Sequence, residues 1–125
     1  MGQAFSALWK VGMKEKSLQF VDTSDIGYFA AQAFIHPDEY KNQGIALAGD
    51  DLTWAQAAEI FKKQKGKAMP TTFDFVAYGL IWALGDVKAM FRWFYTTGYG
   101  ADIQALRKKH PGLVDWTGYL KNNSF

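Results

Sequence analysis

The stretch Leu18–Phe34, with the sequence LQFVDTSDIGYFAAQAF, joins a short apolar run to the start of an amphipathic helix. Leu18–Val21 is brief and mostly apolar, so it predicts a strand. Thr23 or Ser24 can cap the following helix, and Asp25 suits the positive end of its dipole. The apolar residues of that helix recur at helical spacing: Ile26, Phe29, Ala30, Ala33 and Phe34. The stretch therefore predicts a strand, a tight turn and a helix that packs on a core.

Two further runs extend this pattern of short strands followed by helices. Gly44–Ala48 is small and aliphatic and predicts a second strand, while Ala68–Met69 predicts a minimal third one. Between them, Thr53 and Gln56 fit a capping box, in which the hydroxyl accepts from the third helical amide and the glutamine side chain reaches back to the cap. These signals predict a few short strands among about five helices.

Helical spacing governs the remaining segments. Residues 3–14 predict a short amphipathic helix, and the apolar positions from Thr72 onward predict a long helix with a bend near Gly85. Residues 102–107 and 115–121 predict two shorter helices near the end of the chain.

The composition is that of one small domain with nearly balanced charge. The 125 residues, 49% of them hydrophobic, suffice for one sizeable core. The 14 basic and 12 acidic residues give a net charge of +2, which is too small to indicate nucleic-acid binding. The lysine-rich stretches at 62–67 and 107–109 fit the negative ends of helix dipoles instead. The absence of cysteine excludes disulfides, thiol catalysis and cysteine-bound metals.

The sequence also lacks the motifs of several enzyme classes. A glycine-rich turn after a predicted strand, which a dinucleotide fold needs, is missing, and so is a P-loop. No tyrosine has a lysine four residues later for a proton relay. His36 and His110 stand apart without metal-ligand spacing, and each fits a helix-end imidazole better. We therefore expect no catalytic, cofactor-binding or metal-ligating residue in this chain alone.

Targeting signals leave one alternative open. Met1–Ser6 fits the short template for N-myristoylation. The longest uncharged apolar run, Phe75–Leu84, is too short to span a bilayer, and Lys10 and Lys14 interrupt any secretory signal. We therefore expect a protein of the cytoplasm or the nucleus that stays off membranes unless Gly2 is myristoylated.

Four blocks of the sequence form a specific set when they are taken in order. They are Leu18–Phe34, Ile45–Phe61 (IALAGDDLTWAQAAEIF), Met90–Phe94 (MFRWF) and Gly98–Leu113 (GYGADIQALRKKHPGL). Together they resemble the C-terminal part of NmrA-like proteins, which are atypical short-chain dehydrogenase/reductase relatives in the NAD(P)-binding Rossmann superfamily. The resemblance covers nearly the whole chain.

This resemblance implies an α/β fold in which short parallel strands accompany about five helices. It implies that residues 1–125 are a single C-terminal lobe, on the substrate or partner side, without the N-terminal half whose glycine-rich turn binds NAD(P). Intact relatives divide between redox-state sensors in transcriptional regulation and NAD(P)-dependent reductases of small substrates. Alone, the chain is expected to be a fragment that is not catalytic and binds no cofactor.

Aromatic residues around the third block are the candidates for the cleft of such a lobe: Phe91, Trp93, Phe94, Tyr95 and Tyr99. The first four stand so close together that they cannot all face one side of a helix. The resemblance implies that they face a substrate or partner, and packing in the core is the alternative. The lobe is expected to expose an apolar face to a Rossmann-domain partner, another protein or a second copy. The competing interpretation is a self-sufficient peripheral interaction module, myristoylated at Gly2.

Overall fold

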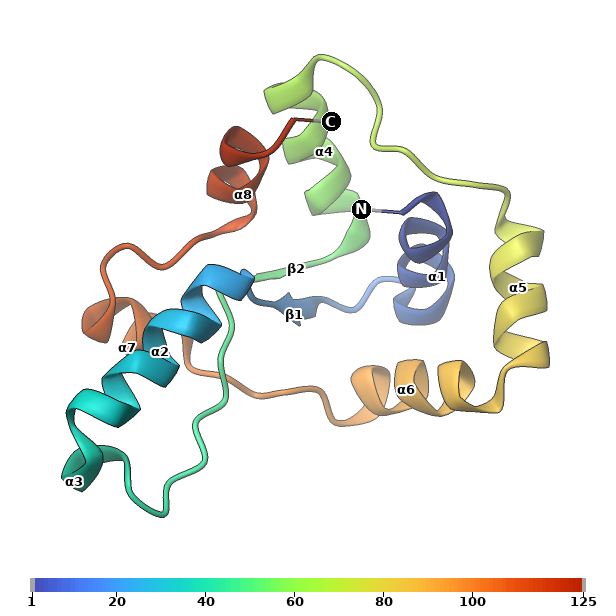
Figure 1. The fold of residues 1–125 in the computed structure, drawn as a ribbon. Coiled ribbons are helices and arrows are strands. Elements are labelled where there is room, and N and C mark those ends of the chain that lie inside the picture. Colours follow the sequence, from blue (N-terminus) through green and yellow to red (C-terminus); the bar gives the residue numbers. More distant parts are fainter. Residues whose placement is uncertain (1, 125) are drawn as a thin grey trace.

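A computed structural model describes residues 2–124, which form eight helices and two short strands (Figure 1). In chain order these are α1 (Gln3–Met13), β1 (Leu18–Phe20), α2 (Thr23–Ile35), α3 (Pro37–Tyr40), β2 (Asp50–Leu52), α4 (Trp54–Lys65), α5 (Asp74–Ala83), α6 (Gly85–Thr96), α7 (Ile103–Lys109) and α8 (Trp116–Asn122).

The fold is mostly helical, and the predicted α/β arrangement with short parallel strands is wrong. Helices account for 62% of the structure and strands for 5%. β1 and β2 pair antiparallel, with Leu18 opposite Leu52 and Phe20 opposite Asp50, and the described residues contain no parallel pair. A sheet of two three-residue strands is too small to form a layer of the fold, so helix packing builds the core.

The second predicted strand, Gly44–Ala48, is irregular because it lies beside a helix rather than a strand. Residues 44–46 line a groove with Leu106 of α7, and Leu47 packs on the smaller core cluster. The ladder begins only at Asp50, where β1 offers its backbone groups. The predicted third strand is also absent, because Met69, in the loop that joins α4 to α5, buries its side chain in the core. Short apolar runs of this kind bury themselves against helices as readily as in sheets.

Several local predictions are confirmed where helices begin and end. The capping box of α4 is formed, with Gln56 N donating to Thr53 Oγ1 at 3.2 Å and Thr53 N donating to Gln56 Oε1 at 2.9 Å. Gly66 ends α4 with a left-handed φ of 68°. The long helix predicted from Thr72 is broken into α5 and α6, which meet at a corner at Leu84, beside the predicted bend (Figure 1).

Two buried clusters hold the helices together. The larger cluster includes Trp9, Met13, Phe61, Phe91 and Leu120, and it joins α1, α4, α5, α6 and α8. The smaller cluster joins α2 to α7 through Phe29, Leu106 and Leu113. Figure 1 shows α2, α3 and α7 gathered on one side of the strand pair, with α1, α5 and α6 on the other. The strand pair therefore lies between the two clusters.

A close approach of α1 to α6 requires glycine at position 12. A Cβ built on Gly12 would lie 2.6 Å from Cδ1 of the buried Phe91 ring. We expect Gly12→Ala to lower the free energy of unfolding by about 1–2 kcal/mol, because overpacking outweighs the better helix propensity of alanine. Gly27→Ala is the matched control, since a Cβ at Gly27 in α2 meets no atom within 4 Å and should stabilise the protein by up to about 1 kcal/mol. Urea unfolding measures both changes, and equal effects would contradict the close approach.

Candidate functional site

The five predicted cleft residues are divided by the structure between the core and the surface. Phe91 is buried against α1, with its ring 6.4 Å from that of Phe5. Trp93 and Tyr99 are partly exposed, and their ring centroids are 5.2 Å apart. Phe94 lies 5.5 Å from Tyr99, so these three rings form one cluster at the end of α6. Phe91 is therefore a core residue, whereas the others remain candidates for a binding surface.

Phe94, Tyr95 and Tyr99 line a cavity of about 320 Å³ between α6 and β1. Its other walls include Lys16, Gln19 and Asp51, so the cavity joins aromatic rings to a cation, an amide and a carboxylate. Lys16 Nζ lies 4.2 Å from the centre of the Tyr95 ring and donates to the Tyr95 carbonyl at 2.8 Å. The structure thus gathers three of the five predicted residues at one polar cavity.

Gln19 fixes the loop that carries this cavity, a role that was not predicted from the sequence. Its Nε2 donates to the carbonyl of Ala101 at 3.1 Å, and its Oε1 accepts from the amide of Ala101 at 2.9 Å. The same Nε2 lies 3.3 Å from Asp51 Oδ2 on the neighbouring strand. A polar residue inside a predicted strand was the only signal in the sequence. Its partner Ala101 lies 82 residues later in the sequence, and no pattern there indicates the contact.

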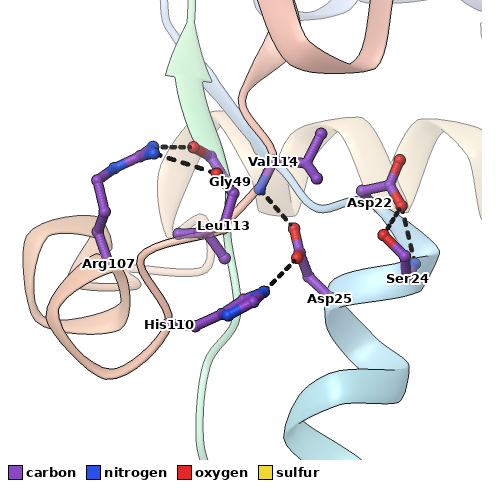
Figure 2. Close-up of polar contacts among 8 residues, drawn as sticks. All are labelled: Asp22, Ser24, Asp25, Gly49, Arg107, His110, Leu113 and Val114. Carbon is purple, nitrogen blue, oxygen red and sulfur yellow. Dashed lines mark hydrogen bonds and ion pairs between the residues drawn. The ribbon is translucent and has the colours of Figure 1, made fainter. Parts of the chain in front are cut away.

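A second group of polar contacts surrounds Asp25, whose side chain is buried at 1% residue exposure (Figure 2). Asp25 Oδ2 accepts from the amide of Val114 at 2.9 Å, and Oδ1 lies 3.2 Å from His110 Nε2. The His110 ring stacks on Tyr28 at 3.7 Å between centroids. The sequence predicted Asp25 as a partner of the helix dipole and His110 as a helix-end imidazole. The contact between Asp25 and His110 links α2 to the segment after α7.

Arg107 holds the same segment from its other side. Its Nη1 donates to the carbonyl of Leu113 at 3.1 Å, and its Nη2 donates to the carbonyl of Gly49 at 3.2 Å. Residues 113 and 114 are therefore held by α7, by α2 and by the start of β2. Because Asp25 is enclosed and its oxygens are occupied, this arrangement favours structural support over acid–base chemistry, which would need access for a substrate.

The N-cap of α2 differs from the prediction. Asp22 occupies it, with its Oδ1 accepting from the amide of Ser24 at 2.8 Å and from the hydroxyl of Ser24 (Figure 2). Thr23 or Ser24 had been predicted as the cap. Aspartate is an equally good cap, so sequence alone could not choose among three adjacent candidates.

An aromatic cavity of about 340 Å³ lies where β1 leads into α2 and where α8 begins. Its aromatic walls are Phe5, Trp9, Phe20, Trp116 and Tyr119, and its polar walls are Asp22, Thr23 and Asp115. The Phe20 ring lies 5.8 Å from Trp9 and 5.7 Å from Trp116, with an edge-to-face geometry in both pairs. No local pattern in the sequence indicates this cavity, because its walls come from four separate elements.

Three further features concern residues 2–124: potential metal ligands, membrane-spanning helices and the myristoylation template. That part of the chain holds no group of three or more potential metal ligands and no helix that is long and apolar enough to cross a membrane. Ser6, the last residue of the myristoylation template, is buried in α1 and accepts a hydrogen bond from Trp54 Nε1 at 3.1 Å. Met1 lies outside the described residues.

The model of the family described as NmrA-like family matches residues 3–118, which is nearly the whole chain. The search of curated proteins finds no match.

Proposed function

The chain belongs to the NmrA-like family, and from this membership we propose that it forms the substrate- or partner-side lobe of such a protein. In this role the lobe covers a cleft, while a Rossmann-type domain holds the dinucleotide. Two features of the described residues support the assignment of the cleft to this lobe and of the dinucleotide to another domain. One is the chemistry of the strand-to-helix turns, and the other is an unpartnered aromatic surface on α5.

NmrA-like proteins bind NAD(P) in general, but the turns of this chain do not fit its phosphates. A pyrophosphate sits where a strand leads into a helix, so that backbone amides and the positive dipole end face it. Here the turn from β1 into α2 carries the carboxylate of Asp22, which caps the helix. β2 itself contains Asp50 and Asp51 just before α4. Negative side chains at both turns repel a pyrophosphate, so we assign the dinucleotide to another domain.

The aromatic surface of α5 is the observation that carries the proposal. Phe75, Tyr78 and Trp82 follow one another at helical spacing and are 71%, 63% and 88% exposed. On the opposite face of the helix, Ala77 is fully buried in the larger core cluster. A helix that is apolar on both faces is typical of a buried position. We propose that this aromatic surface (Phe75, Tyr78 and Trp82) packs on the dinucleotide-binding domain.

We expect a complex between this chain and the dinucleotide-binding domain of an NmrA-like protein supplied as a separate chain. Trp82→Ser should weaken the complex at least about tenfold, because a tryptophan buried in an interface commonly contributes about 2 kcal/mol or more. Phe34→Ser is the matched control, since Phe34 is 87% exposed but lies at the end of α2. Isothermal titration calorimetry measures both affinities. Equal losses from the two variants, or no complex at all, would contradict the docking surface.

The same preparation tests the division of labour. Titration of the chain alone with NAD, NADH, NADP and NADPH should give no saturable signal, whereas the complex should bind one of these dinucleotides. Micromolar affinity of the chain alone would overturn the proposal. Whether the assembled protein is a redox sensor or a reductase then follows from whether the bound NAD(P)H is consumed when small carbonyl or aromatic substrates are added.

A further inference from the structure

We propose that the aromatic cavity at the start of α2 and α8 binds a small organic ammonium ion with an apolar body. This goes beyond the proposed function, because it concerns a site made entirely of this chain's own residues. The cavity, of about 340 Å³, is large enough for an arylalkyl ammonium ion.

The walls of the cavity supply the two kinds of group that recognise such an ion. The rings of Trp9, Phe20 and Trp116 pack edge to face at centroid distances of 5.7–5.8 Å and form one apolar wall of the cavity. Trp9 and Trp116 are themselves buried, so Phe5 and Phe20 offer the more accessible rings. Aromatic faces attract a cation through their quadrupole. The rings therefore suit both the apolar body and the positive charge of the ligand.

The charge of the walls is negative. Asp22 and Asp115 line the cavity, and no lysine, arginine or histidine is among its lining residues. Each carboxylate uses Oδ1 to cap a helix, Asp22 for α2 and Asp115 for α8, where it accepts from Gly118 N at 2.7 Å. Their Oδ2 atoms accept no hydrogen bond from the described residues. The helix N-termini offset part of this charge, but two oxygens remain free for an ammonium group.

One lining residue also lacks a partner of its own. The indole Nε1–H of Trp9 is buried and meets no acceptor within residues 2–124. A buried donor without an acceptor is rare in folded proteins. An ammonium ion offers no acceptor to this N–H, so Trp9 contributes to the site through its aromatic ring alone.

Three probes of similar size separate charge recognition from simple apolar binding: phenethylammonium, the neutral 2-phenylethanol and the anionic phenylacetate. We expect the ammonium ion to bind roughly tenfold more tightly than the alcohol, and the acid to bind more weakly than either. In proton–nitrogen NMR spectra the indole resonances of Trp9 and Trp116 should shift during the titration, whereas that of the exposed Trp82 should not.

Asparagine variants test the carboxylates without removing the caps, because asparagine caps a helix as well as aspartate does. Asp22→Asn together with Asp115→Asn should bring the affinity for phenethylammonium down to that for 2-phenylethanol. Asp102→Asn is the matched control, since Asp102 caps α7 and does not line this cavity. Equal binding of all three probes, no binding by any of them, or an equal loss in the Asp102→Asn variant would overturn the proposal.

Discussion

Asp25→Ala is expected to lower the free energy of unfolding by about 2–4 kcal/mol, because it leaves the amide of Val114 and the ring of His110 without their acceptor. Both groups lie in a partly enclosed region where water cannot fully replace the carboxylate. Urea unfolding followed by circular dichroism should show a lower midpoint with an unchanged slope. Asp25→Asn keeps one acceptor oxygen, so we expect it to lose less stability than Asp25→Ala.

Asp22→Ala provides the comparison for this prediction. Asp22 is three residues away, and its hydrogen bonds are confined to the capping of α2. Loss of an exposed cap costs typically about 1 kcal/mol. If Asp25→Ala cost no more than Asp22→Ala, the buried carboxylate would not be a tie between α2 and the segment at Val114.

Gly49→Ala is the second change from which we expect a large loss. A Cβ at Gly49 would lie 2.0 Å from the carbonyl oxygen of Val114, so the backbone on one side must move. That movement would strain the bond from Gly49 N to the Phe20 carbonyl, at 2.8 Å, and the bond from Arg107 to the Gly49 carbonyl. We expect a loss of about 3 kcal/mol, at the upper end of overpacking effects.

Thermal unfolding measures this change as a fall in Tm of roughly 10 °C, since about 1 kcal/mol corresponds to roughly 4 °C in a protein of this size. Gly44→Ala is the control, because a Cβ at Gly44 meets no atom within 4 Å, and it should leave Tm nearly unchanged. A Gly49→Ala protein as stable as the Gly44→Ala protein would show that Val114 does not pack against β2 as the structure places it.

The features that the sequence predicted correctly depend on residues close to one another in the chain. The capping box of Thr53 and Gln56 spans three residues, and the left-handed end of α4 depends on Gly66 alone. The first strand is predicted correctly at Leu18, and the long helix breaks beside the predicted bend. In each case the local backbone and its nearest side chains decide the conformation.

The features that the sequence missed depend on contacts between distant segments. The direction and register of the strand pair follow from where Leu18 meets Leu52, which no local pattern encodes. Asp25 finds its partners 85 and 89 residues later, at His110 and Val114. The predicted cleft aromatics show the same limit, because helical spacing alone could not separate the buried Phe91 from the exposed Trp93.

Val114 lies in the chain between Leu113 of the smaller core cluster and Trp116 of the larger one. Its amide is bound on the side of α2, its carbonyl packs against Gly49, and its side chain lines the aromatic cavity. If the smaller cluster opened by itself, Val114 would have to be released, and the larger cluster would be disturbed at the same time. We therefore expect thermal unfolding to show a single cooperative transition rather than two in succession.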